Sequence, residues 1–350
     1  MEGQGHGRVR VARHGGADLI VGALTVFPVI GDRILPLSAA RRWLLRAAAA
    51  LLWSCATAVS AQDIRVTLLG TGTPAPVMNR FGASILVEAG DQKFLFDAGR
   101  GALQRLGQAR VRWKDVNGVF LTHLHSDHVV GFPDLWLTGW LVGQREMPLL
   151  VWGPRGTAKM MGHLAQAYEY DIAIRQADEH ASATGVLIVA TDVAEGFVYE
   201  RNGVRITPFN VDHAPVEPAL GYRIDFRGRS VVLSGDTRFS ENLIRRAEGV
   251  DLLIHEVAAI ASHLREGVAP AQAVRITAHH TTPEQAGEVF ARVKPKLAVY
   301  SHIGRPSATE SEVIAPTRKT YDGPLELGED LMVIDVGEAV SVRRPVPALR

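Results

Sequence analysis

The chain has 350 residues, of which 47% are hydrophobic and 21% charged, with 38 basic and 37 acidic side chains. This length can hold one large or two ordinary domains, and this hydrophobic content is enough for a substantial core, which excludes a mainly disordered chain. The nearly balanced charge excludes a general attraction to nucleic acid phosphates as the basis of binding.

Residues 41–61 have the pattern of an export signal. Arg41-Arg42 precede an uncharged, mostly apolar run from Ala47 to Val59, and Val59-Ser60-Ala61 offer small residues for cleavage. The run is shorter than the roughly 20 residues of a membrane span. We therefore predict a signal peptide over 41–61 that uses the Sec or the twin-arginine route. The mature protein would be periplasmic or secreted and would meet the membrane only through this segment. An uncleaved anchor is the alternative.

The segment before the signal is not expected to fold, and the part after it is mildly acidic. Residues 1–40 are predicted to be a disordered or mis-assigned extension. Residues 1–61 hold seven arginines and three acids, so the remainder has 38 − 7 = 31 basic and 37 − 3 = 34 acidic residues, a net charge of −3. The single cysteine, Cys55, lies in the signal. A metal site in the mature chain must therefore be built from histidines and carboxylates.

Short apolar runs alternate with turn signals and helical patterns from residue 62 onward. No repeat or linker interrupts this pattern, so residues 62–342 are predicted to form a single domain, with a tail over 343–350. Strands are predicted at 64–69, 84–89, 93–96, 119–121, 185–198 and 203–210, a hairpin at 220–234, and helices at 131–142, 157–170 and 282–292.

The segment from His123 to His128 places four candidate metal ligands within six residues, directly after a predicted strand. Imidazole and carboxylate together suit zinc, iron or manganese rather than calcium. One ion cannot easily accept all four side chains from so tight a turn. The segment therefore predicts two neighbouring ions, with His123 and His125 facing one and Asp127 and His128 facing the other. The alternative is a histidine-rich surface loop that binds nothing.

Five apolar strands are predicted to end in residues that can bind a metal ion. These ends are His123, Asp212-His213, Asp236, His255-Glu256 and Ser301-His302. A single such end would be an ordinary buried histidine more often than a ligand. Five of them indicate that the strand ends converge on one edge of the sheets.

These residues resemble the metallo-β-lactamase superfamily, whose His-x-His-x-Asp-His signature corresponds to residues 123–128. The resemblance covers residues 62 to about 342 and implies an α/β fold, a four-layer αβ/βα sandwich with a two-metal site at one edge of its sheets. Residues 69–74, 233–237 and 280–282 are most similar to the branch that contains ribonuclease Z and certain exported arylsulfatases.

The resemblance implies a site for two zinc ions, with iron or manganese as alternatives. The first ion would be held by His123, His125 and His213, the second by Asp127, His128 and His302, and Asp236 would bridge both. Water shared by the two ions would lose a proton near neutral pH and become the nucleophile, and Asp127 could orient it.

Roles are also predicted for residues around the ligands. His280 is the candidate proton donor to the leaving oxygen, with Glu256 as its partner, and the alternative for His280 is capping of the following helix. His255 is expected to support the ligands or to be simply a residue at a strand end, and Asp97 is expected to brace the ligand loop by hydrogen bonds. His279 is expected to face away from the site.

The remaining histidines and the tryptophans carry weaker expectations. His163, His180 and His263 are expected on the surface. Trp136, Trp140 and Trp152 could line an apolar wall for an aromatic leaving group, or pack as ordinary core.

The predicted function is an exported two-metal hydrolase of small sulfate or phosphodiester esters, without a nucleic acid partner. In ribonuclease Z, an arm that grips tRNA lies between the third metal-binding histidine and the bridging aspartate. Here the 23 positions from His213 to Asp236 are filled by a hairpin. The alternatives are hydrolysis of lactones, β-lactams or thioesters on the same site, tRNA 3′ processing, and a diiron redox protein. The resemblance also raises the expectation of a homodimer paired through helices beside the site.

Overall fold

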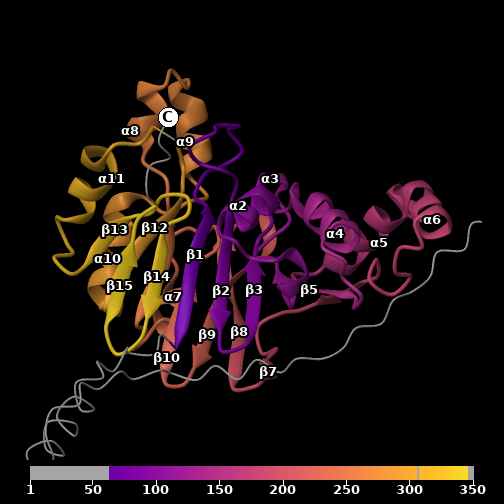
Figure 1. Ribbon diagram of the computed structural model, residues 1–350. Coiled ribbons are helices and arrows are strands. Elements are labelled where there is room, and N and C mark those ends of the chain that lie inside the picture. Colours follow the sequence, from indigo (N-terminus) through magenta and orange to yellow (C-terminus); the bar gives the residue numbers. More distant parts are fainter. Residues whose placement is uncertain (1–62, 306, 346–350) are drawn as a thin grey trace, which may run out of the picture. The chain divides into compact units, whose positions relative to one another are not determined.

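A computed structural model describes residues 63–305 and 307–345 of the chain (Figure 1). The predicted extension over 1–40 and the predicted signal over 41–61 lie outside these residues. No helix among the described residues combines the length and the apolar character that a membrane crossing requires.

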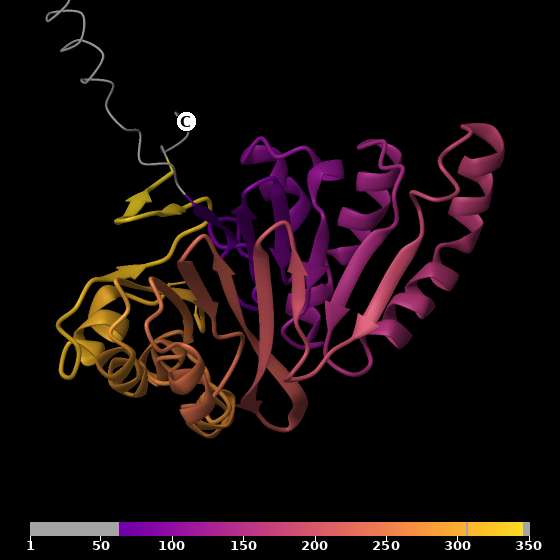
Figure 2. The same ribbon diagram turned by 90° about the horizontal axis from the view of Figure 1, so that it is seen from below.

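Two β-sheets lie face to face in the described part of the chain (Figure 2). The first sheet has the strand order β15-β14-β1-β2-β3-β4-β5-β6, with β1 (Ile64–Gly70), β2 (Ser84–Ala89), β3 (Gln92–Phe96), β4 (Gly118–Phe120), β5 (Leu149–Gly153), β6 (Ile188–Asp192), β14 (Val333–Val336) and β15 (Val340–Arg343). The second has the order β13-β12-β11-β10-β9-β8-β7, with β7 (Tyr199–Arg201), β8 (Val204–His213), β9 (Val216–Phe226), β10 (Arg229–Leu233), β11 (Leu252–Val257), β12 (Leu297–Ile303) and β13 (Leu325–Leu327).

Helices cover the outer face of each sheet. On the side of the first sheet lie α2 (Ala102–Gln108), the short 3₁₀ helix η1 (Trp113–Asp115), α3 (Ser126–Val129), α4 (Phe132–Leu141), α5 (Thr157–Ala167) and α6 (Glu169–Asp178). On the side of the second lie α7 (Glu241–Arg246), α10 (Pro283–Val293) and α11 (Glu310–Thr317), while α8 (Ile260–Arg265) and α9 (Pro270–Thr277) lie at the edge of the sandwich, at the top of Figure 1.

Three hydrophobic cores separate these layers. The core between the sheets contains Phe120 of the first sheet and Tyr222 of the second, whose rings lie 5.5 Å apart. A second core joins the first sheet to α2, α4 and α5, and a third joins the second sheet to α7, α10 and α11. This succession of helices, sheet, sheet and helices confirms the predicted four-layer αβ/βα sandwich.

The tryptophans belong to these cores and not to a substrate-facing wall. Trp136 and Trp140 belong to α4, and their side chains are buried. Their indole nitrogens donate hydrogen bonds to the backbone carbonyls of Val186 and Ser182. Trp152 stacks on Phe120 between the sheets, with ring centroids 4.7 Å apart. Of the two alternatives for these tryptophans, ordinary core packing is therefore confirmed and the apolar wall for an aromatic leaving group is excluded.

The predicted helices at 131–142 and 282–292 are confirmed as α4 and α10. The latter begins after Thr282, whose side chain accepts a hydrogen bond from the amide of Gln285, while the Gln285 side chain accepts one from the Thr282 amide. This reciprocal arrangement satisfies amides that have no partner inside the helix, and Pro283 fits the first helical turn.

Two predicted elements are shorter than the sequence pattern indicated. The helix expected over 157–170 divides into α5 and α6, because Tyr168 leaves the helical conformation and packs its ring against Trp136. The strand expected over 185–198 pairs with β5 only as far as Asp192. The Asp192 carboxylate instead accepts hydrogen bonds from the amides of Gly156 and Ala158 at the start of α5.

The strands that precede the candidate ligands end at the same edge of the sandwich. In the second sheet β10, β11 and β12 run parallel, and in the first sheet β4 is parallel to β3 and β5. Parallel strands deliver their carboxyl ends to one edge, so the side chains that follow them meet there. The predicted convergence of strand ends is confirmed.

The loop after β1 reaches this edge and is fixed there by a buried carboxylate. Asp330, which is 6% exposed, accepts hydrogen bonds from the Thr71 amide and hydroxyl and from the Phe81 amide, and Arg105 pairs with it at 2.9 Å. Four donors on one carboxylate tie the loop to the rest of the domain.

Replacing this carboxylate should destabilise the domain strongly. We expect Asp330→Ala to lower the free energy of unfolding by about 3–5 kcal/mol, because it leaves Arg105 and two amides without their partner. Urea denaturation followed by circular dichroism measures this change. The matched control is Asp178→Ala on the exposed end of α6, for which a change within about 0.5 kcal/mol is expected. A loss below about 1 kcal/mol for Asp330→Ala would contradict the assignment.

Candidate metal centre

The segment that carries the four clustered ligands is braced by Asp97, as predicted. The Asp97 carboxylate accepts hydrogen bonds from the Thr122 amide and hydroxyl, each at 2.8 Å, and from Nδ1 of His128 at 2.8 Å. Asp97 itself has a left-handed backbone, with φ 59°. Because Nδ1 of His128 is bound to Asp97, Nε2 is the ring nitrogen that faces the centre of the site.

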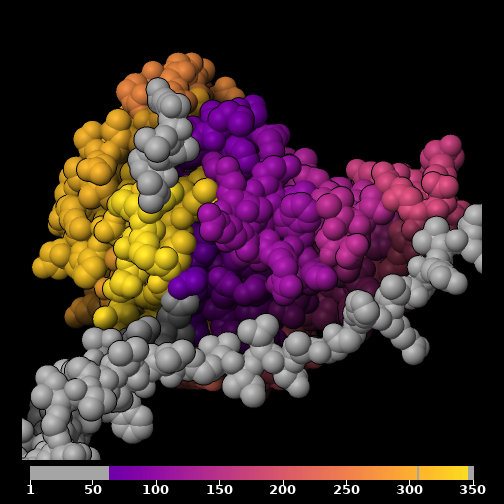
Figure 3. Space-filling view, viewed as in Figure 1, coloured from indigo at the N-terminus to yellow at the C-terminus, as the bar shows by residue number. Residues whose placement is uncertain are grey.

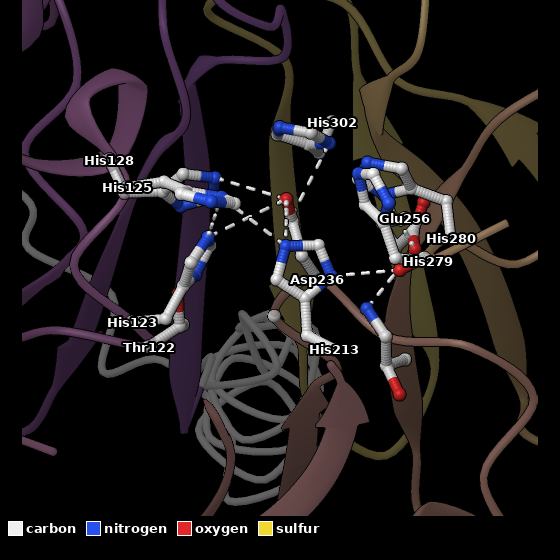
Figure 4. Close-up of polar contacts among 12 residues, drawn as sticks. Thr122, His123, His125, His128, His213, Asp236, Glu256, His279, His280 and His302 are labelled. Carbon is white, nitrogen blue, oxygen red and sulfur yellow. Dashed lines mark hydrogen bonds and ion pairs between the residues drawn. The ribbon is translucent and has the colours of Figure 1, made fainter. Parts of the chain in front are cut away.

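Three histidine nitrogens converge on one point of the site (Figure 4). Nδ1 of His125 lies 3.0 Å from Nε2 of His123 and 3.3 Å from Nε2 of His213. The other ring nitrogen of His213 donates to the carbonyl of His279 at 2.8 Å, which fixes its orientation. Lone pairs this close together are stable only with a proton or a cation between them. This first group is the one predicted for the first ion.

A second group lies beside the first. Nε2 of His302 is 3.2 Å from Oδ2 of Asp127, and Nε2 of His128 is 3.7 Å from the same oxygen. His302 has a φ of 43°, in the left-handed region that non-glycine residues seldom adopt. The fold thus holds this histidine in a strained conformation at the end of β12. The second group is the one predicted for the second ion.

Asp236 lies between the two groups. Its Oδ2 is 3.4 Å from Nε2 of His128 and 3.8 Å from Nε2 of His123, and its Oδ1 is 3.4 Å from Nδ1 of His302. Gly235 has a φ of 60°, and a Cβ there would lie 2.6 Å from the carbonyl of Leu220. Only glycine allows this turn, which directs Asp236 into the centre.

Burial and neighbouring charges decide the protonation of these groups. Burial lowers the pKa of His123 well below its usual range and that of His213 to about 4. For Asp236, burial alone would raise the pKa, but the imidazoles of His302 and His128 outweigh this effect and hold it well below its usual range. The pKa of His128 moves the other way: burial would lower it, but Asp236 and Asp97 outweigh this effect and raise it well above its usual range. A divalent cation bound at the same nitrogen would take the place of that proton, because a metal requires its histidine ligands to be deprotonated.

Three buried polar atoms at the centre indicate where a cation would fit. Nε2 of His128, Oδ1 of Asp236 and Nδ1 of His302 are enclosed and have no hydrogen-bond partner among the described residues. Buried polar atoms are almost always satisfied, so three such atoms within one buried site need another partner. Nitrogen and oxygen donors without thiolate are typical of divalent metal sites. The His/Asp clusters therefore form a divalent-metal site.

His280 and Glu256 form a pair beside the metal centre. The carboxylate of Glu256 accepts hydrogen bonds from the amides of Thr237 and Thr281 and lies 3.1 Å from Nδ1 of His280. The helix cap is Thr282, so the alternative role of His280 in capping is excluded. Burial disfavours a charged His280, but the charge and hydrogen bond of Glu256 outweigh this effect and raise its pKa to about 9.

Expectations for several other histidines need correction. His255 is buried, donates to the carbonyl of Glu256 and packs against Phe290, and it makes no hydrogen bond to a candidate ligand among the described residues. His279 does not face away, since its ring lies 5.2 Å from that of His213. His263 is not on the surface but buried at 1% exposure. His163 and His180 are exposed, as expected.

The two misplaced histidines lie in the segment between β11 and α10. This segment joins the strand end at Glu256 to His280, so its path must follow the edge where the ligands meet. That connectivity is visible in the sequence and could have placed His263 and His279 near the site.

Comparisons with known proteins agree on the family. The family model described as "Beta-lactamase superfamily domain" matches residues 92–303. The ribonuclease Z of Mycolicibacterium gilvum is 37% identical over 287 residues, which cover 80% of this chain and 99% of that protein. The ribonuclease Z of Mycobacterium avium is 38% identical over 280 residues, which cover 78% of this chain and 98% of that protein.

Solved structures share the fold. The metallo-β-lactamase fold protein YhfI from Bacillus subtilis matches with a TM-score of 0.59 and 20% identity, over 77% of this chain and 98% of that one. The short form of human tRNase Z matches with a TM-score of 0.57 and 20% identity, over the same shares of the two chains. At this identity the likeness concerns the fold alone.

The curated relatives overturn two predictions. Proteins named ribonuclease Z, 35–38% identical over nearly their whole length, contradict an exported arylsulfatase-like hydrolase and the absence of a nucleic acid partner. The physical reason for the error is that net charge averages over the whole surface, whereas a substrate meets only the local surface around the cleft.

Asp97 offers a test of the metal site that leaves the ligands intact. We expect Asp97→Asn to weaken zinc affinity by about 10–100-fold, because the amide cannot accept all three hydrogen bonds that orient Thr122 and His128. Competition with a chromophoric chelator measures the affinity. The control Asp134→Asn alters an exposed carboxylate on α4 and should retain the wild-type affinity. Equal affinities for all three proteins would contradict the role assigned to Asp97.

Proposed function

The chain belongs to the metallo-β-lactamase superfamily and, within it, to the ribonuclease Z family, and on this premise we propose that it is an endoribonuclease that processes the 3′ side of tRNA precursors. As a member of this superfamily it is a metal-dependent hydrolase. The proposal adds the bond, a phosphodiester, and the substrate, an RNA.

The observation that carries the proposal is the match to curated ribonucleases Z along almost their entire length. The alignment spans 287 positions and takes in 99% of the M. gilvum protein, and it covers 80% of the 350 residues of this chain, or about 280. The two proteins are therefore nearly the same length over the matched region. The described structure has only the β9–β10 hairpin between His213 and Asp236. The missing arm therefore does not distinguish this chain from proteins that bear the name ribonuclease Z.

The proposed cofactor is a pair of zinc ions. His123, His125 and His213 would hold the first, Asp127, His128 and His302 the second, and Asp236 would contact both. The donor atoms of each group lie within 4.8 Å of one another, which supports this division. Bound zinc polarises a phosphoryl oxygen and makes water a better nucleophile at neutral pH.

Asp127 and His280 would handle the protons of the reaction. Burial alone would raise the pKa of Asp127, but its hydrogen bond with His302 and the charges of His128 and His302 together outweigh this effect and lower the pKa to about 2. Asp127 is therefore ionised at neutral pH and can accept a hydrogen bond from the attacking water. His280, with its raised pKa, is protonated at neutral pH and can donate a proton to the leaving oxygen.

A cleft lined by Pro74, His125 and His279, among others, opens on the metal ligands. Arginines beside this cleft support an anionic substrate. The exposed side chain of Arg100 donates to the carbonyl of Pro74, a residue that lines the cleft, at 3.2 Å. Arg238 donates at 2.7 Å to the carbonyl of Ala278, next to His279, although Asp212 offsets part of its charge at 3.2 Å. Positive side chains at a cleft raise the local concentration of a polyanion.

The substrate class can be tested directly. We expect the zinc-loaded protein to cleave a tRNA precursor with a 3′ trailer at a single position and to turn over 4-nitrophenyl sulfate poorly or not at all. Denaturing gel electrophoresis and absorbance, respectively, follow these reactions. Asp236→Ala should reduce RNA cleavage by at least about a thousandfold, because it removes the carboxylate shared by both metal groups. Efficient hydrolysis of the sulfate without RNA cleavage would refute the proposal.

The pH dependence of cleavage tests the proton donor. A group with a raised pKa loses its proton only as pH rises through that value, so kcat should fall on the alkaline side. We expect Glu256→Gln to move this alkaline limb to lower pH by about one to three units, because the charge that stabilises protonated His280 is removed. The exposed control Glu248→Gln should keep the wild-type profile. An unmoved limb in Glu256→Gln would show that His280 is not the titrating group.

A further inference from the structure

The cleft that opens on the metal ligands extends away from them, toward α8. It has a volume of about 320 Å³ and is lined by His125, Asp127 and Asp236 and, on the side of α8, by His263 and Arg305. Figure 3 shows the outer surface of this region, where α8 and α9 (orange) lie at the top of the molecule beside the loop after β1 (indigo). This part of the cleft can hold a part of the substrate that is bound but not chemically changed.

His263 presents a single hydrogen-bond acceptor to this end of the cleft. Its side chain is only 1% exposed, and its Nδ1 donates to the carbonyl of Ala259 at 2.9 Å. Burial lowers the pKa of His263, so the ring is neutral at pH 7. With the proton on Nδ1, the lone pair of Nε2 is free to accept, and Nε2 has no partner among the described residues.

Arg305 places a cation next to this acceptor. One of its terminal nitrogens, Nη2, pairs with Glu266 at 2.6 Å, and Nη1 has no hydrogen-bond partner within the described part of the chain. The preceding residue, Gly304, allows the close approach, since a Cβ there would lie 3.2 Å from Cε1 of His263. A neutral acceptor and a guanidinium thus line the same end of one cleft.

These two groups match the chemistry of a ribonucleotide. A ribose 2′-hydroxyl can donate a hydrogen bond, and recognition of this hydroxyl is how a protein distinguishes RNA from DNA at a given position. The adjacent phosphate suits a guanidinium, which forms strong, directional hydrogen bonds to phosphate oxygens. The metal ligands at the other end of the cleft would hold the scissile phosphate.

We propose that the α8 end of the cleft is a subsite for the nucleotide next to the scissile bond, in which Nε2 of His263 accepts a hydrogen bond from the 2′-hydroxyl and Arg305 binds the neighbouring phosphate. This inference rests on the proposed ribonuclease function and adds the residues that select RNA over DNA.

The test combines changes in the protein with the removal of single hydroxyls from the RNA. The substrate is a tRNA precursor with a 2′-deoxynucleotide on one or the other side of the cleavage site. For wild type, we expect one of these substitutions to lower kcat/KM by about 3- to 10-fold, the effect of one hydrogen bond. In His263→Leu the all-RNA substrate should be cleaved more slowly and the same deoxy substitution should have no further effect. His263→Gln, which retains an acceptor near the position of Nε2, should regain part of the discrimination.

Salt dependence tests the contact with Arg305. We expect Arg305→Gln to reduce the slope of log KM against log salt concentration by about 0.7, the value for one lost phosphate contact on a single strand. The control Glu266→Gln breaks the ion pair but keeps the cation, and should retain the wild-type slope.

Controls separate this inference from the function on which it rests. The exposed His180→Leu should show wild-type discrimination, and zinc content and melting temperature should be measured for every variant to detect a merely structural effect. Discrimination that persists unchanged in His263→Leu, or wild type that cleaves RNA without sensing either hydroxyl, would overturn the subsite alone. Wild type that cleaves no RNA precursor would overturn the ribonuclease function as well.

Discussion

The carboxylate of Asp236 is buried between two sheets, and a negative charge in that position requires positive charge close by. Much of the local structure meets this requirement. His123 and His128 approach the carboxylate from the loop after β4, and His213 and His302 from the ends of β8 and β12. The left-handed backbone of Gly235 and His302 and the brace formed by Asp97 are consequences of directing these side chains to one point. The metal ions expected there would supply the compensating charge that imidazoles alone provide only when protonated.

The candidate ligands could be identified from the sequence because two regularities act together. The apolar runs at 231–233 and 297–300 predict buried strands from their own residues alone, and the structure has buried strands there. Parallel strands then end at a common edge. A polar residue directly after such a strand, such as Asp236 or His302, must therefore lie at that edge. The start of α10 at Thr282 could be predicted as well, because its cap depends only on Thr282 and on Gln285, three positions later.

Features that depend on the path of irregular segments could not be predicted in this way. His263 lies on a six-residue helix within the connection from β11 to α10, and no periodicity specifies how such a connection folds back over the edge. The break between α5 and α6 at Tyr168 depends on a contact with Trp136, which is remote in sequence. The substrate was misjudged for a related reason: overall charge and the length of one loop say little about the few side chains that line the cleft.

The division of the ligands between the sheets has a mechanical consequence. His123, His125, Asp127 and His128 follow a strand of the first sheet, whereas His213, Asp236 and His302 belong to the second. Each ion would therefore link the two sheets of the sandwich. Occupancy at a hundredfold excess over the dissociation constant contributes about 2.7 kcal/mol per site to stability. Without the proposed ions the protein would be a looser form, more open to proteases where the two sheets meet, so that metal supply would govern how long the protein persists as well as how fast it works.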